Sequence, residues 1–226
     1  MKKVRHYKFT DFLIGIIFTL LFLSIAVIIS INFRPLYYLD INILDIETTS
    51  GFPRAEILDN YNALIDYCSP FFKGDLNFPT LGASQSGLQH FKEVKDIFTY
   101  FYILAAITLV AAIIIIVYKA HRKNINYLPV ASITAIVIPA VTGALLMINF
   151  DKAFVLFHKL FFKNDYWIFD PDTDPVIQIL PDTFFLHSAL LIIFLVLLAS
   201  LSTYIIYLLL KKRSGIRYRK LPNIKL

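Results

Sequence analysis

Cysteine and glycine are scarce in this chain of 226 residues, which contains one Cys and seven Gly. A single cysteine excludes an internal disulfide, and Cys68 is expected to be a small apolar filler. No Gly-x-Ser-x-Gly sequence is present. The segment Ala83-Ser84-Gln85-Ser86-Gly87 resembles that motif only superficially. A serine hydrolase of that type is therefore not favoured.

Acidic residues are nearly missing from three basic segments of the chain. These segments carry 4, 3 and 7 of the 22 Lys and Arg residues and a single acid, Asp11: residues 1–11, 119–126 and 211–226. The other 15 acids fall in two segments, 32–97 and 149–183. By the positive-inside rule, the basic segments, and with them both termini, face the cytoplasm. The net charge of +6 is thus an orientation signal, and no nucleic-acid partner is expected.

Long apolar runs are what the chain has in abundance, since 58% of its residues are hydrophobic. A helix needs about 20 apolar residues to cross a bilayer, and four stretches qualify. The first is not a secretion signal, because its apolar run is long and no Ala-x-Ala-like cleavage site follows it. We predict an all-α, polytopic membrane protein, a single membrane domain over 1–226, with spans at about 12–31, 98–118, 127–148 and 184–210.

The first outer segment, 32–97, is too long to be a plain loop and should contain structure. After Pro53, a candidate first-turn residue, apolar side chains recur at helical spacing and predict a short amphipathic helix: Ile57, Tyr61, Leu64, Ile65 and Cys68. Ser84 or Ser86 is placed to cap a helix that continues into the second span.

The second outer segment, 149–183, begins with aromatic residues at helical spacing: Phe150, Phe154, Phe157 and Phe161. With Lys159 and Lys163 nearby, this pattern is typical of a helix that lies in the membrane interface. An acidic, turn-rich connection follows, and the last helix is expected to begin at Leu180-Pro181-Asp182. Both outer segments are therefore predicted to contain short interfacial helices.

Two of the five histidines are candidates for catalysis. His6 and His121 lie among the cytoplasmic basic residues, and His187 is placed as an interfacial anchor at the start of the fourth span. His90 and His158 lie on the predicted outer helices, His90 about eight residues, or roughly 12 Å, above the second span. Because imidazole exchanges protons near neutral pH, such a pair suits acyl chemistry on a lipid, with one base and one donor to an oxyanion.

Metal sites are the main alternative for these residues. A zinc ion could take His90 and His158 with one acid, Asp96, Asp165 or Asp174, but no His-Glu-x-x-His sequence supports this. The acidic run 165–174 lacks the spacing of a calcium loop and is expected to face water. No metal and no cofactor are therefore expected.

The outer motifs as a set, in the order of the chain, are Asp59-Asn60-Tyr61-Asn62, His90 with Val94-Lys95-Asp96, Phe157-His158-x-x-Phe161-Phe162-x-Asn164-Asp165-x-Trp167, Asp174 and Leu180-Pro181-x-x-Phe184-Phe185. With the four spans, this set resembles the bacterial lipoprotein intramolecular transacylase family, Lit, over nearly the whole chain. The stretch from Phe157 to Trp167 is its most specific part.

The resemblance implies an acyltransferase of the bacterial cell membrane that acts at the outer leaflet on diacylglyceryl-modified lipoproteins. It would move the sn-2 acyl chain of the diacylglyceryl-Cys to the Cys α-amino group, giving the lyso form, with membrane lipid as its surroundings. The expected catalytic pair is His90 and His158; the candidate orienting or substrate-positioning residues are Tyr61, Asn62, Asp96, Asn164, Asp165, Trp167 and Asp174.

Two other functions stay open at this point. A non-enzymatic assembly protein would use exposed apolar residues such as Phe154 and Phe161 to bind a partner. A membrane-embedded lipid or peptide hydrolase would release a free product, whereas a transacylase keeps the total number of acyl chains constant.

Overall fold

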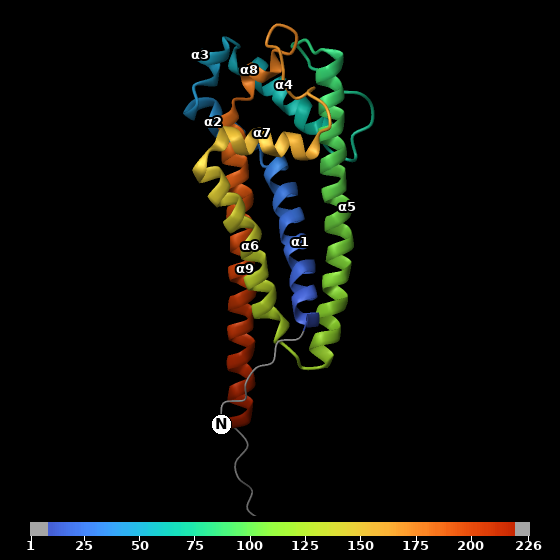
Figure 1. Cartoon of the computed structure of the whole chain (residues 1–226), viewed down its shortest axis with the longest axis vertical. Helices are drawn as coiled ribbons and strands as arrows, with labels where there is room; N and C mark the ends of the chain where they lie inside the picture. Colours follow the sequence, from blue (N-terminus) through green and yellow to red (C-terminus); the bar gives the residue numbers. More distant parts are fainter. Residues whose placement is uncertain (1–8, 220–226) are drawn as a thin grey trace, which may run out of the picture.

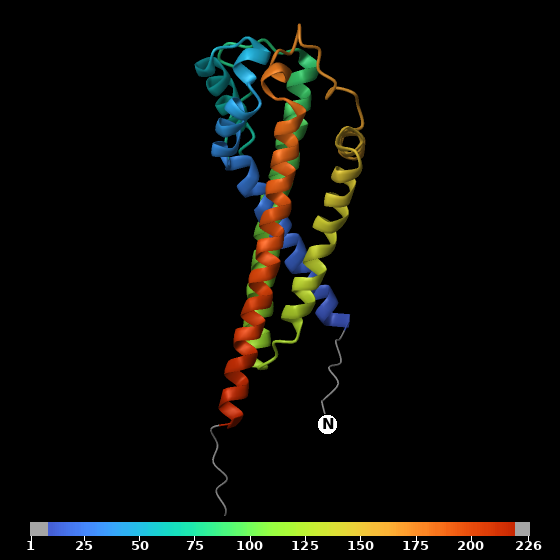
Figure 2. The same ribbon diagram turned by 90° about the vertical axis from the view of Figure 1, so that its left-hand side faces the viewer.

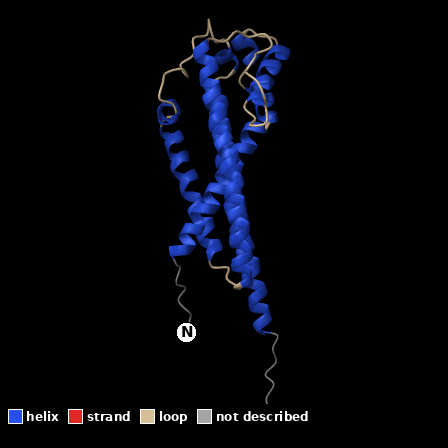
Figure 3. Ribbon diagram, turned by 90° about the vertical axis from the view of Figure 1, so that its right-hand side faces the viewer, coloured by secondary structure: helices blue, strands red, loops and turns tan. Residues whose placement is uncertain are grey.

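The computed structural model describes residues 9–219, without the side chains of 214–219, so His6 lies outside the described residues. In this part of the chain all regular structure is α-helical (Figure 3). The helices long and apolar enough to cross a membrane are α1 (Phe9–Asn32), α5 (Gln85–His121), α6 (Tyr127–Ile148) and α9 (Asp182–Arg219). The prediction of an all-α protein with four membrane-spanning helices is confirmed.

Helix α1 is the centre of the bundle, since it packs against α5, α6 and α9. Helices α5 and α6, which are joined by a short connection, run antiparallel, and α1 lies between them (Figure 1). The side chains of the shared core come from all four helices: Ile14, Phe18, Leu21, Ala112, Tyr127, Leu128, Ala131 and Tyr207.

Two buried polar contacts between the long helices stabilise the bundle. Ser132 of α6 and Ser200 of α9 donate reciprocally to each other's backbone carbonyl, at 3.0 and 2.8 Å. Such contacts between membrane helices contribute about 0.6–2 kcal/mol each. Near the basic end, Lys119 Nζ lies 2.9 Å from Asp11 Oδ1, and both side chains are largely buried. Removing the Asp11 carboxylate would take away the counter-charge of the buried Lys119 ammonium, which costs about 3–5 kcal/mol.

A cap of short helices covers the opposite end of the bundle (Figures 1 and 2). It contains α2 (Arg34–Ile43), α3 (Ile46–Ser50), α4 (Arg54–Tyr67) and α8 (Val176–Ile179). Helix α4 is the amphipathic helix predicted after Pro53, which occupies its N-cap position and not its first turn. The apolar face of α4 is buried in the cap core together with residues of α2, α3 and α8: Tyr37, Ile41, Ile46, Ile57, Tyr61, Leu64, Val176 and Ile179.

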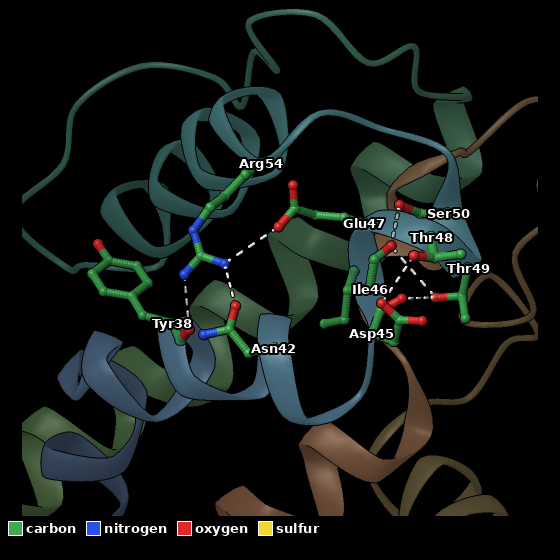
Figure 4. Close-up of polar contacts among 9 residues, drawn as sticks. All are labelled: Tyr38, Asn42, Asp45, Ile46, Glu47, Thr48, Thr49, Ser50 and Arg54. Carbon is green, nitrogen blue, oxygen red and sulfur yellow. Dashed lines mark hydrogen bonds and ion pairs between the residues drawn. The ribbon is translucent and has the colours of Figure 1, made fainter.

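Arg54 ties the first three cap helices together (Figure 4). From the start of α4, its guanidinium donates to Asn42 Oδ1 at 2.7 Å and to the Tyr38 carbonyl at 3.2 Å, both in α2. It also pairs with Glu47 of α3 at 3.4 Å. Between these helices Asp45 adopts a left-handed conformation with φ of 51°, which turns the chain sharply from α2 into α3.

Helix α7 (Phe150–Phe161) runs across the bundle below the cap, nearly perpendicular to the long helices (Figure 1). It is the aromatic helix predicted from the spacing of its phenylalanines. Most of its apolar side chains are exposed, among them Leu156, Phe157 and Leu160. His158 is its one buried residue.

Candidate active site

His90 is presented by the first turns of α5, before the apolar part of that helix. Ser84 is the N-cap, and its hydroxyl accepts a hydrogen bond from the Gly87 amide at 3.0 Å. Asp174, which is buried, accepts a second bond from the Ser84 amide through Oδ1 at 2.8 Å. The hydroxyl and the amide of Ser84 thus both fix the start of α5, between one and two turns before His90.

His158 is presented by α7 from the other outer segment. Asn149 caps this helix by accepting the Lys152 amide at 2.8 Å. The Nδ1 atom of His158 lies 2.8 Å from the carbonyl oxygen of Phe154, one turn earlier. Because a carbonyl only accepts, Nδ1 carries the hydrogen and Nε2 keeps its lone pair.

The two imidazole rings face each other across an aromatic nest, with centroids 6.1 Å apart and planes at 33°. Phe162 lies against both rings, at 4.6 Å from His90 and 5.6 Å from His158. Phe169 contacts His90 at 5.5 Å, and Trp167 stacks on His158 at 4.7 Å. Two helices and one aromatic loop therefore bring together two histidines that are 68 residues apart in the sequence.

This apolar nest keeps both rings neutral. Burial, and then the neighbouring charge of His158, lowers the pKa of His90 to about 4. Burial also lowers the pKa of His158, although its bond to the Phe154 carbonyl and the negative charge of Asp182 act in the opposite direction. The Nδ1 atom of His90 is buried and has no hydrogen-bond partner within residues 9–219. Two neutral imidazoles can accept and return a proton without holding it.

Glu93 connects the aromatic loop to α5 and was not anticipated from the sequence. It lies one turn after His90, and its carboxylate accepts from Asn164 Nδ2 at 2.9 and 3.2 Å. The carbonyl of Asn164 in turn accepts from Trp167 Nε1 at 3.1 Å. Trp167 therefore lies beside the histidine pair, and the polar groups of Asn164 and Trp167 hold the loop in place. The spacing of Glu93 from His90 was the signal that could have revealed it.

Other predicted site residues lie elsewhere. Tyr61 is buried in the cap core, stacked on Tyr37 at 3.7 Å. Asn62 accepts from Arg34 at 2.9 Å and from Tyr38 at 2.8 Å. These two residues hold α4 against α2, and neither contacts the histidine rings among the described residues.

Among residues 9–219, the acids predicted as orienting or substrate-positioning groups make no hydrogen bond to His90 or His158. Asp96 and Asp165 are exposed, and no side-chain hydrogen bond of either is found within residues 9–219. Asp174 accepts a hydrogen bond from the Ser84 amide and so positions the start of α5.

In the part of the chain described, no three His, Cys, Asp or Glu side chains lie close enough together to hold a metal ion, so the alternative ligand set is not assembled. Burial also raises the pKa of the Cys68 thiol to about 12, which fits the predicted role of a filler.

Comparison with known proteins matches the family model for the lipoprotein intramolecular transacylase Lit to residues 12–185. The structure is similar to that of the membrane-integral lipoprotein intramolecular transacylase Lit from Bacillus cereus. The TM-score is 0.88 at 37% identity, over 92% of this chain and 98% of that one.

Two further structures of the Bacillus cereus protein carry a histidine replaced by arginine or by alanine, and they match with TM-scores of 0.82 and 0.83 at 37% and 36% identity. They cover 95% and 96% of their own chains and 92% of this one. A comparison with curated proteins gives no match. The family model and the solved structures agree over most of the chain, and the chain belongs to the Lit family of lipoprotein intramolecular transacylases.

Proposed function

We propose that this protein moves the sn-2 acyl chain of a diacylglyceryl-modified lipoprotein to the α-amino group of its N-terminal Cys, with His90 and His158 as the catalytic pair. The observation that carries the proposal is the pair itself: two neutral imidazoles, 6.1 Å apart, in an aromatic nest next to the ends of the spans. The product is the lyso form, an N-acyl, S-monoacylglyceryl lipoprotein.

The reaction needs no acyl-enzyme intermediate. The amine nitrogen attacks the carbonyl carbon of the sn-2 ester in the same molecule; a C–N bond forms and the C–O bond to the glyceryl carbon breaks. One histidine takes the proton that the attacking nitrogen loses, and a proton is returned to the glyceryl oxygen as it leaves. The second histidine donates to the oxyanion. Positioning amine and ester for attack supplies much of the rate enhancement.

The aromatic nest supports this chemistry in two ways. The rings of Phe162, Phe169 and Trp167 exclude water from the imidazoles, which disfavours hydrolysis of the ester. Their apolar surface also suits a glycerolipid head that has to fold back on itself. Trp167 is proposed to contact the substrate through its ring, since its indole hydrogen is already used.

The proposed orientation places both termini in the cytoplasm and the histidine pair at the outer leaflet of the bacterial cell membrane. It is supported by the sequence, because the three segments that alternate with the outer segments along the chain, 1–11, 119–126 and 211–226, carry 14 basic residues and a single acid. A substrate lipoprotein anchored in the outer leaflet would then meet the site directly.

Mass spectrometry of the N-terminal lipopeptide tests the function, using a lipoprotein coexpressed with this protein in a host that lacks its own N-acylation step. We expect one acyl chain on the Cys amine and one fewer on the glyceryl group. His90→Ala and His158→Ala should each lower product formation about 100- to 10,000-fold, the range for loss of an acid or base. His121→Ala, at the other end of α5 and exposed, is the matched control.

The outcomes separate the alternatives. Normal product from both site variants would refute the catalytic pair. An unchanged diacylglyceryl peptide from the wild-type protein would refute the transacylase, and loss of one acyl chain without N-acylation would indicate a hydrolase.

A further inference from the structure

Helix α7 presents three faces with different properties. Its inner face carries His158, which is buried, and Phe154, whose ring lies 5.6 Å from that of Phe185 in α9. A second face is apolar and open, with Leu156 59% and Leu160 74% exposed. Because α7 runs across the ends of the long helices (Figure 1), this second face is expected to rest on the hydrocarbon of the bilayer.

The third face of α7 holds a shallow hollow of about 370 Å³. Its lining residues are all exposed: Asp151, Lys152, Val155, Leu156 and Lys159. The two lysines are seven residues, or about two helical turns, apart, so they lie on the same side of α7 and about 10 Å from each other along its axis. Val155 and Leu156 form an apolar floor between them. The hollow therefore combines two positive charges with an apolar surface.

The charges around the hollow balance a single phosphodiester. Two ammonium groups and one carboxylate give it a net charge of +1. Within residues 9–219, neither an ion pair nor a side-chain hydrogen bond is found for Asp151, Lys152 or Lys159. The phosphate of an anionic phospholipid would neutralise this charge, whereas a zwitterionic headgroup would leave it unbalanced. Lysine near a membrane surface is attracted to anionic lipid in this way.

The hollow is placed at the edge of the hydrocarbon, where lipid phosphates lie. Met147 and Ile148, the last residues of α6, are 89% and 80% exposed, so the apolar surface of that span continues to its end. Helix α7 begins two residues later, at Phe150, and its axis then runs across the bundle. Lysine side chains at this edge extend toward the headgroups while their stems cover apolar surface. A phosphate is thus the group that meets Lys152 and Lys159 there.

The hollow lies on the side of α7 that faces away from the aromatic nest, since Lys152 and Lys159 are about half a turn around the helix from Phe154. We propose that α7 binds the phosphate of an anionic phospholipid between Lys152 and Lys159, and that the bound lipid holds His158 in the aromatic nest. The lipid covers α7 from outside, as the nest does from inside, and it takes no part in acyl transfer. The lipid site goes beyond the proposed function, and only its effect on the rate rests on that function.

Titration with anionic lipid tests the site, using purified full-length protein in phosphatidylcholine vesicles with an increasing fraction of phosphatidylglycerol. Trp167, the single tryptophan of the chain, stacks on His158 at 4.7 Å, so its fluorescence reports on the nest. We expect the fluorescence change and the rate of lyso-lipoprotein formation to rise together and to saturate. Lys152→Gln and Lys159→Gln should each raise the fraction of phosphatidylglycerol at half effect about fivefold, and the double variant should not reach saturation.

Two further variants separate a site on α7 from a general effect of surface charge. Val155→Phe fills the floor of the hollow without changing its charge and should also weaken the titration. The double variant Lys73→Gln/Lys92→Gln, which removes two exposed lysines of the first outer segment, should titrate like the wild type.

Three results would overturn the proposal. They are an unchanged titration when both α7 lysines are replaced, an equal loss in the control double variant, and recovery of the fluorescence change by inorganic phosphate in phosphatidylcholine vesicles. The fluorescence titration does not depend on turnover. A saturable fluorescence change without any N-acyl product would therefore support the lipid site and refute the proposed function.

Discussion

Gly87 lies where the start of α5 meets Asp174, and the contact leaves no room for a side chain. A Cβ atom added to Gly87 would overlap Oδ1 of Asp174, lie 3.0 Å from its Cγ and lie 3.2 Å from the Phe169 ring. The carboxylate can approach the backbone only because glycine stands there. This close approach determines the position of the first turn of α5, and with it the position of His90, one turn further along the helix.

Gly87→Ala should therefore destabilise the protein although alanine is the better helix former. Overpacking of this kind costs about 1–3 kcal/mol, and the displaced Asp174 would also lose its bond to the Ser84 amide. Thermal unfolding in detergent and the rate of product formation should both fall. Gly82→Ala is the matched control, because the nearest atom to its added Cβ is the Thr173 carbonyl oxygen at 3.9 Å. Equal behaviour of the two variants would contradict the contact.

At the residue scale, side-chain chemistry selected the candidate histidine pair from the sequence. Imidazoles on outer helices singled out His90 and His158, and the structure brings them together. Contacts between distant segments were not predicted. Nδ1 of His187 lies 2.8 Å from Oδ1 of Asp40, which is 147 residues away in the sequence, whereas His187 was predicted to be an interfacial anchor. No periodic pattern encodes a contact between residues so distant in the chain. Tyr61 and Asn62, predicted as substrate-positioning residues, lie in the cap and hold α4 against α2.

At the scale of elements, α7 is the helix whose packing most directly affects the proposed site. It carries His158 as its one buried residue, while its other side chains are partly or fully exposed. The hydrogen bond that Asn149 accepts from the Lys152 amide is therefore an important constraint on the first turn of α7. The helix was predicted from its phenylalanines, whereas α2, α3 and α8 were not, since their short sequences show too little periodicity.

Asn149→Ala should loosen the start of α7 and misplace His158. Loss of a side-chain cap costs about 0.5–2 kcal/mol, and the effect should be local because α7 has few neighbours. Hydrogen exchange at the Lys152 amide should accelerate and the reaction rate should fall, with little change in global unfolding. Asn126→Ala is the control: Asn126 is the N-cap of α6 but makes no side-chain capping bond. An unchanged exchange rate at Lys152 in Asn149→Ala would refute this role.

For the whole molecule, hydropathy predicted the four long helices because a bilayer demands about 20 apolar residues in succession. The packing order could not be predicted in the same way, since the lipid-facing and helix-facing sides of a span are both apolar. Small and polar residues at the contacts, such as Ser132 with Ser200, specify the order, and they are sparse in the sequence.

The proposed orientation predicts which end of the molecule is reachable from outside the cell. Asp165→Cys, at an exposed position of the outer loop, should react with a membrane-impermeant maleimide on intact cells. His121→Cys, exposed at the other end, should react only after the membrane is permeabilised. The native Cys68 gives little background because it is buried and its pKa is raised to about 12. The reverse pattern of labelling would invert the orientation.

Helix α5 continues without a break from the cap to the basic end, over 37 residues. At 1.5 Å per residue it is about 55 Å long, against roughly 30 Å of hydrocarbon. His90 is therefore attached to a rod whose position is determined by the fit of its apolar part to the bilayer. A thicker membrane would draw the imidazole toward the acyl chains, and a thinner one would lift it above the ester groups of the lipid. For the proposed reaction, hydrophobic mismatch is thus expected to be a kinetic variable, since membrane thickness would change how well His90 is aligned with the reacting groups.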